Sequence, residues 1–154
     1  MTYSIANRPH WTIDPTLPEE IEGAAALISW FGFVPDFHDA IIRRIAFEGF
    51  DGLVVLSAFR MTSEVDEQGF FVLDRHARVS LFFDKVIGVV FDCIPDNTIQ
   101  ELRIRRLAPE HLPVSKNLDA TTGDYEVAFD DVCGGTGAIY ARNVRIGFER
   151  EMAG

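Results

Sequence analysis

The chain has few cysteines, and their placement limits what they can do. Cys93 and Cys133 lie far apart, and neither has a cysteine or histidine at metal-ligand spacing beside it. We therefore expect two buried free thiols rather than a disulfide framework. The four histidines are also scattered through the sequence. We predict neither a metal site nor a cofactor.

Long apolar runs are also absent. The longest, Gly23 to Val34, is shorter than the roughly 20 residues that a helix needs to cross a bilayer, and Ser29 interrupts it. The first ten residues contain no basic stretch leading into an apolar run, which argues against a secretory signal. These absences predict a cytoplasmic protein that does not contact the membrane.

Basic residues are scarce, because 14 Lys and Arg stand against 24 Asp and Glu, giving a formal net charge of −10. The acids are spread from Asp14 to Glu151 rather than gathered in a tail. Such a field repels nucleic acid and speeds encounter with cationic proteins. The acidity disfavours a nucleic-acid ligand. It leaves two interpretations: simple solubility, or attraction of a basic partner.

Apolar residues, in contrast, are plentiful. They make up 47% of the 154 residues and include 13 Phe. This content is well above that of disordered chains, and the length suits one core. We predict a single domain over residues 1–154.

One helix is predicted at Pro18 to Trp30. Proline at its opening and acids in its first turns suit the positive end of the helix dipole, and Gly32 is a plausible stop. Apolar residues recur at intervals of three and four, which predicts one stripe facing a sheet. They are Ile21, Ala24, Ala25, Ile28 and Phe31.

After the helix the hydrophobic period changes to two, which indicates half-buried strands. Asp51-Gly52 favours a hairpin, and Val86 to Phe91 is apolar on both faces, as in a central strand covered from both sides. The fold class is therefore mainly β (α+β): an antiparallel β-sandwich or strongly curved sheet of six to seven strands with the N-terminal helix packed on it. Strands are predicted at 40–48, 53–61, 78–84, 85–93, 102–105, 125–130 and 144–149.

Two connections stand out between the strands. Leu107 to Gly123 lacks periodicity and predicts a long, functionally interesting loop. Gly134 to Gly137 resembles a phosphate-binding loop in composition, but it joins two predicted strands, so we expect a turn.

The sharpest candidate site is the corner Asp36, Phe37, His38 and Asp39, between the helix and the first strand. A carboxylate-oriented histidine can act as a general base or ligand. Adjacent residues of an extended segment point opposite ways, so we expect Asp36 rather than Asp39 to reach His38. The structural alternative is that both aspartates accept bonds from backbone donors while His38 covers the strand edge.

Two further clusters have a structural and a functional interpretation. Arg103, Arg105 and Arg106 form a basic cluster, which we expect on a solvated face paired with acids. The aromatic residues from Trp30 to Phe37, with Trp11, are expected in the core, with a contact patch as the alternative.

The segment from Trp30 to Ala40 contains the sequence Phe-His-Asp-Ala and resembles the opening motif of the immunity protein 50 family and its small bacterial relatives. The resemblance spans roughly residues 28–148, and it departs at Ile41, where the family pattern has an acid. It implies a cytoplasmic protein that neutralises a toxin by binding it, and it implies no catalytic residues.

These observations predict a non-enzymatic interaction protein, in which an acidic surface complements a basic toxin. The alternative is an enzyme or small-ligand-binding protein built around His38, Asp36 and Asp39. A homo-oligomer that pairs through an exposed aromatic patch is a third possibility.

Overall fold

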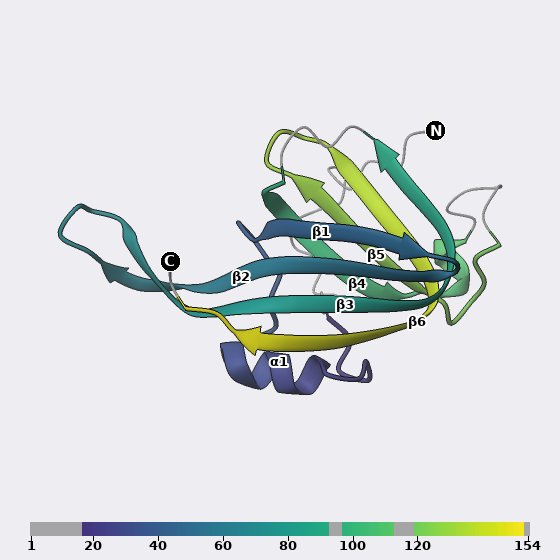
Figure 1. Cartoon of the computed structure of the whole chain (residues 1–154), viewed down its shortest axis with the longest axis horizontal. Helices are drawn as coiled ribbons and strands as arrows, with labels where there is room; N and C mark the ends of the chain where they lie inside the picture. The colour runs from purple at the N-terminus through teal and green to yellow at the C-terminus, as the bar shows by residue number, and fades with distance from the viewer. Residues whose placement is uncertain (1–16, 93–96, 113–118, 153–154) are drawn as a thin grey trace.

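The computed structural model describes residues 17–92, 97–112 and 119–152, and in them one antiparallel sheet dominates. The strand order is β1-β2-β3-β6-β5-β4, and the sheet curves strongly so that β4 and β5 lie behind β1 to β3 (Figure 1). This confirms the mainly β prediction, as one curved sheet rather than a two-sheet sandwich. The strands are β1 (Ile41–Glu48), β2 (Asp51–Val65), β3 (Phe71–Asp92), β4 (Ile99–Arg106), β5 (Tyr125–Asp131) and β6 (Thr136–Arg150).

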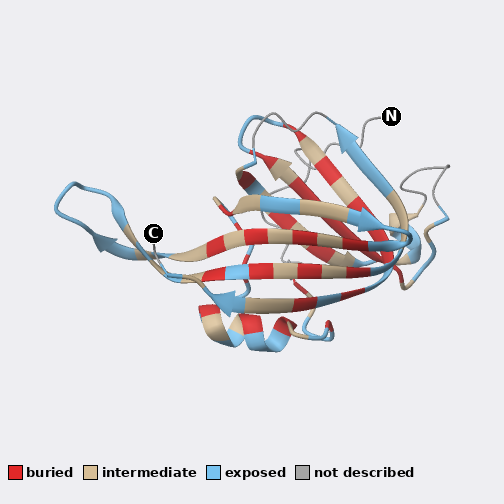
Figure 2. Cartoon of the chain, in the orientation of Figure 1, coloured by how far each residue is buried: buried red, intermediate tan, exposed pale blue. Residues whose placement is uncertain are grey.

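The core fills the concave side of this sheet. On β3 the buried Val79, Leu81 and Phe83 alternate with less buried residues, and buried bands alternate in the same way along β2 (Figure 2). Period-two alternation places every second side chain on the concave side. Buried residues of β2 to β6 and of the helix belong to one hydrophobic cluster, and the partly buried Ile42 and Ile45 of β1 pack against it, so burial of this shared face stabilises the whole sheet.

The two ends of the sheet approach each other without closing it. The backbone N–H of Ile42 donates to the Asn97 carbonyl and that of Ile99 to the Ala40 carbonyl, each at 2.8 Å. One further bond runs from the Asp39 N–H to the Ile99 carbonyl at 2.8 Å. The segment entering β1 is therefore hydrogen-bonded to the start of β4.

The helix α1 (Ala24–Phe31) starts later than the sequence predicts. Gly23 has φ 88°, and the Glu22 carbonyl accepts the Ile146 N–H at 2.8 Å, so the chain before α1 is held against β6 instead of being helical. The predicted stop is confirmed, because Gly32 takes a left-handed conformation and its N–H donates to Ile28. The helix buries Leu27 and Phe31 in the core.

Strand β3 merges two predicted strands into one of 22 residues. Lys85, with φ 52°, marks the join beside an irregularity in the pairing with β6. The prediction that Val86 to Phe91 is covered on both sides is wrong, because Val90 and Phe91 are exposed. The reason is topological: β2 starts at Asp51, so this end of β3 pairs with β6 but extends past β2.

The opposite end of β3 forms a projecting hairpin with β2. Beyond a bulge at Arg75, where φ is 52°, the two strands leave the body of the molecule (Figure 1). Arg60 and Asp74 clamp the base through two hydrogen bonds, of 2.8 and 2.6 Å. We call residues 61–73 the arm.

Several smaller predictions have mixed outcomes. The hairpin between β1 and β2 is present, but its turn is Gly49-Phe50, two residues before Asp51-Gly52. The turn between β5 and β6 is confirmed, with the Asp131 carboxylate accepting from the N–H groups of Cys133 and Gly135. Cys133 itself is exposed, against prediction, because it lies in this turn.

Parts of other predictions lie outside the described residues. These parts are Cys93, Trp11 and residues 113–118 of the predicted 107–123 loop; the described part of that loop contains the 3-10 helix η2 (Pro109–His111). Within the described ranges no helix has the length and apolar content needed to cross a bilayer.

Gly23 offers a direct test of how the segment before α1 is held. A Cβ there would lie 1.8 Å from the Ile146 carbonyl oxygen, in addition to the strain of φ 88°. We expect Gly23→Ala to lower the free energy of unfolding in urea by about 3 kcal/mol or more. Gly69 has the same φ with nothing within 4 Å, so Gly69→Ala should cost only about 1 kcal/mol. Equal losses in the two variants would contradict the account.

Candidate functional site

The predicted corner is a compact turn rather than an extended segment. Phe37 and Asp39 both have positive φ, 60° and 64°, and the Ala40 N–H donates to the Phe37 carbonyl at 3.0 Å. Positive φ is uncommon for residues other than glycine, so surrounding contacts must hold it. Here the buried Phe37 side chain and the bonds from this segment to β4 supply those contacts.

This turn changes which groups meet His38. The Asp36 carboxylate accepts the backbone N–H of His38 at 3.0 Å, as the structural alternative predicts. The ring lies nearer to Asp39, with 3.6 Å between Nε2 and the carboxylate. The expectation that Asp39 points away is therefore wrong, because two left-handed residues remove the alternation on which it rests.

The other ring nitrogen of His38 is held by the sheet edge. Nδ1 lies 2.8 Å from the Gln100 carbonyl of β4, which only accepts, so Nδ1 carries the proton. This bond raises the pKa of His38 above its ordinary value of 6.5; partial burial opposes the shift, and the charges of Asp39 and Asp36 add to it. The corner thus favours the imidazolium form.

A small cavity of about 220 Å³ adjoins the corner. Phe31, Phe33, Phe37 and Phe59 supply most of its apolar wall, and His38 lies at its margin with 46% of its side chain exposed. Typical small-molecule pockets occupy roughly 300–1,000 Å³. The cavity therefore suits only a small molecule.

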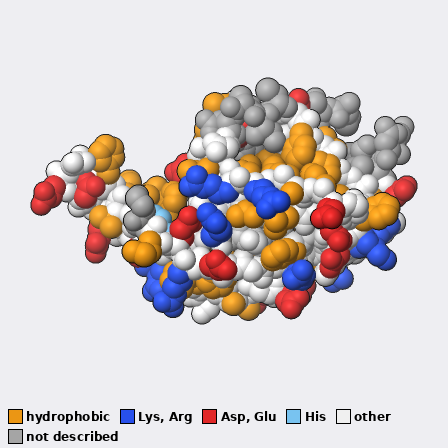
Figure 3. Space-filling view, in the orientation of Figure 1, with side chains coloured by type: hydrophobic (Ala, Val, Ile, Leu, Met, Phe, Trp, Pro, Cys, Tyr) orange, Lys and Arg blue, Asp and Glu red, His pale blue; other side chains and the backbone are white. Residues whose placement is uncertain are grey.

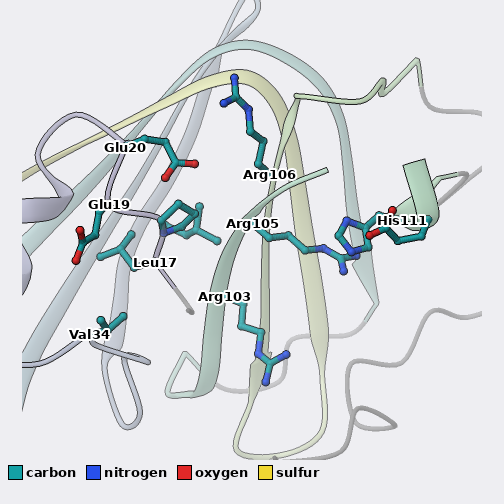
Figure 4. A pocket seen from close by; sticks show the side chains of 11 residues that line it. Leu17, Glu19, Glu20, Val34, Arg103, Arg105, Arg106 and His111 are labelled. Carbon is teal, nitrogen blue, oxygen red and sulfur yellow. The ribbon is translucent and has the colours of Figure 1, made fainter. Parts of the chain in front are cut away.

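A larger cavity, of about 510 Å³, lies beside β4 and contains the predicted arginine cluster (Figure 4). Leu17, Glu19 and Glu20 of the segment before α1 line the cavity, and Arg105 extends from β4 toward His111. His111 Nδ1 accepts the Ala108 N–H at 3.0 Å and so helps to shape η2.

The arginine side chains of this cavity are already engaged. Arg103 pairs with Glu101 at 2.6 Å, and Arg105 pairs with Glu126 at 2.8 Å. Glu126, only 2% exposed, also accepts the Tyr140 hydroxyl at 2.8 Å. The predicted pairing with acids is confirmed for Arg103 and Arg105, which are partly buried, while Arg106 is exposed to solvent as predicted. Because these arginines are paired with carboxylates of their own chain, they indicate a structural role.

A carboxylate that the sequence analysis missed lies on the same face. Asp130 has one buried carboxylate oxygen for which the structure provides no hydrogen-bond partner. Burial raises its pKa, and the charge of Glu101, its cross-strand neighbour, raises it further. Period-two alternation would have placed Asp130 outside the core, but only the coordinates show its burial.

No group of three or more His, Cys, Asp or Glu among the described residues is arranged to hold a metal.

The convex face of the sheet contains a second feature that the sequence analysis missed. Arg43 and Arg44 of β1 and Arg78 of β3 surround a hollow of about 600 Å³, whose floor includes Val55 and Ser80. As in the cavity beside β4, three arginines gather here. We call this the arginine hollow. Alternation along each strand could have predicted that Arg44 and Arg78 point outward. It could not have predicted that residues of two different strands line one hollow.

Comparison with known proteins provides no further assignment. No protein-family model matches the chain, and neither a curated protein nor a solved structure matches it.

The pKa shift of His38 gives a pH prediction with a defined sign. A histidine whose pKa is raised on folding stabilises the fold below its unfolded pKa, and this contribution is lost as pH rises through the folded pKa. The parent chain should therefore exceed His38→Gln in free energy of unfolding by more at about pH 5.5 than at about pH 8.5. Unfolding in urea at both values measures this.

An NMR titration of the His38 ring provides the control. Its midpoint should lie above 6.5 and fall in Asp39→Asn, which keeps the Gln100 bond. A midpoint below 6.5 would contradict the geometry described here.

Proposed function

We propose that this chain is a non-enzymatic protein-interaction domain whose arm inserts into a basic partner. One observation carries the proposal: the arm projects from the body and exposes large apolar side chains that the core does not use. Phe70 is 67% and Phe71 55% exposed. Apolar groups gathered in this way are typical of contact surfaces. The exposed apolar residues of the arm are Met61, Val65, Phe70, Phe71 and Leu73.

The charge of the arm indicates the chemistry of its partner. Glu64, Asp66 and Glu67 lie among the apolar residues, and residues 61–73 contain no Lys or Arg. Figure 3 shows acidic and hydrophobic side chains together on this projection. Complementary charge raises the association rate and orients the partners, while buried aromatic side chains provide most of the affinity. A basic surface with an apolar pocket meets both requirements.

The hairpin is shaped to present these side chains. Asp66 accepts the N–H groups of Gln68 and Phe70, both at 2.9 Å, which fixes the turn at its tip. The Arg60 guanidinium holds the pKa of Asp74 below its ordinary value, so the ion pair at the base persists over the neutral range. An arm ordered at both ends loses less conformational entropy when it binds.

The resemblance of residues 28–148 to the immunity protein 50 family suggests which basic partner to test. In this proposal the partner is a bacterial toxin in the cytoplasm, and binding of the arm neutralises it. The net charge of −10 supports rapid capture of such a protein. The Phe-His-Asp-Ala corner then has a structural role, because it attaches to β4 the segment that precedes β1.

A second candidate function rests on the cavity at the corner. Phe31, Phe33 and Phe59 offer aromatic contacts, and His38 favours its cationic form. We propose that this cavity suits a small aromatic carboxylate. No nucleophile is needed for such binding.

The arm makes the first proposal testable. If a toxin gene lies immediately upstream, co-expression of this chain should rescue growth, and the purified proteins should bind. Phe70→Ala and Phe71→Ala should each weaken binding at least about tenfold, because each removes an aromatic side chain that fills a pocket of the partner. Titration calorimetry measures the binding, and unfolding in urea should remain unchanged.

Phe50→Ala is the matched control. Phe50 is 76% exposed but lies in the turn between β1 and β2, outside the arm. This variant should bind and rescue as the parent does. Failure of the parent chain to bind or neutralise the toxin would remove the immunity role, and equal losses in Phe50→Ala would remove the arm from it.

The second candidate has its own readout. Benzoate, added at millimolar concentration, should shift the NMR resonances of the His38 ring, and His38→Gln should weaken binding. Val34→Ala, outside this cavity, serves as the control. If the ring does not respond to benzoate, the cavity is not a site for this class of ligand.

A further inference from the structure

The arm and the arginine hollow carry opposite charges on one molecule. The arm bears three acids and no base, while three arginines and one acid, Glu149, line the hollow. Both also carry apolar groups: Phe70 and Phe71 are exposed on the arm, and the half-buried Phe82 lines the hollow. Figure 3 shows basic side chains interspersed with hydrophobic ones over the sheet and acidic ones on the arm. The two surfaces are complementary in charge and in apolar character.

The arginines of the hollow retain unused binding capacity. Arg44 is exposed, and no carboxylate of the described residues forms an ion pair with it. Arg78 is 3.9 Å from Glu151, a loose ion pair with more than half of the Arg78 side chain exposed. Arg43 donates through Nε to Ser57 at 2.9 Å, which leaves its terminal nitrogens available. Anionic groups arriving from outside would therefore meet donors that are at most loosely paired.

The hollow shares strands β2 and β3 with the arm, and this relation determines the symmetry that can join two copies. The hollow includes Val55 of β2 and Ser80 of β3, and the arm is the far end of the same hairpin. From Val55 to Asp66 the strand extends roughly 35 Å, at about 3.3 Å per residue. A twofold axis across the strands, midway along this length, places each arm over the hollow of the other copy.

We propose that the partner of the arginine hollow is the arm of a second copy of this chain, so that two copies exchange arms in a symmetric dimer. Glu64 and Glu67 face Arg44 and Arg78 across each contact, and Phe70 and Phe71 cover the apolar floor. The exchange is reciprocal, because a one-way contact of this kind would continue into an open filament.

Reciprocity also enlarges the interface toward the size of a stable one. Specific dimers bury roughly 1,200–2,000 Å² in total. One hairpin tip on one hollow is a small contact, and the twofold arrangement doubles it. The same axis brings the convex faces of β2 and β3 together between the two contacts. Each exposed aromatic side chain of the arm is thereby removed from water.

This inference goes beyond the proposed function, since the dimer requires no other protein. It also predicts competition: a basic partner that binds the arm must displace the hollow of the second copy. Loss of arginines from the hollow would then release the arm and strengthen partner binding.

Charge reversal tests the dimer on the purified chain by sedimentation and light scattering. The parent should dimerise, while Glu64→Arg/Glu67→Arg and Arg44→Glu/Arg78→Glu should each dissociate at least about 30-fold more readily, because like charges would then meet. The variant with all four substitutions should dimerise again. Raising salt from about 0.05 M to about 0.5 M should weaken the parent dimer, because salt screens the exposed ion pairs.

The controls separate this inference from the proposed function. Glu19→Arg/Glu20→Arg makes the same charge change outside the arm and should leave the dimer intact, and circular dichroism checks that every variant is folded. A monomeric parent at about 100 µM, an intact dimer in either reversed variant, or mass that keeps growing with concentration would each overturn the proposal. If the toxin bound Arg44→Glu/Arg78→Glu only as tightly as it binds the parent, the result would support the proposed function but contradict the dimer.

Discussion

The pairing of β3 with β2 and β6 is the interaction on which the rest of the structure depends. Within the body, this register directs Val79, Leu81 and Phe83 into the concave side of the sheet, where burial stabilises it. The same strand continues past the body at both ends. Its first residues form half of the arm, and its last residues extend beyond β2. One strand therefore connects the core to the surfaces available for binding.

The two bulged sites along β3 explain how one strand serves both purposes. Arg75 and Lys85 have the same positive φ, 52°; Arg75 lies where the ladder with β2 shifts register, and Lys85 lies just before the shift between Val86 and Gly88 in the ladder with β6. A bulge bends and twists a strand locally while pairing resumes on either side. Between the bulges the strand is part of the curved body, and outside them it changes direction. The ion pair of Arg60 with Asp74 fixes the bend at the base of the arm.

The sequence predicts the class of the fold because alternation is a local property, but it does not predict the ends of the elements. Nothing local distinguishes a strand that stops at Asp84 from one that continues through Lys85, since tertiary pairing decides it. The helix start was misplaced because Pro18 and its acids satisfy the rules for an N-terminus, whereas the contact of Glu22 with β6 overrides them. At the corner, residues 36 to 39 were found by composition, but their geometry depends on two left-handed residues. The arginine hollow combines residues of β1 and β3, so only the assembled sheet reveals it.

The end of β3 beyond β2 has a consequence for partial unfolding. Residues 86–91 contain no charged side chain, and several of them are exposed while β6 still occupies one edge. If β6 dissociated, this segment would present two open edges of β-branched and aromatic residues, the composition that favours cross-β stacking between chains. The integrity of the β3–β6 ladder, more than that of the helix, therefore guards the chain against amyloid-like association.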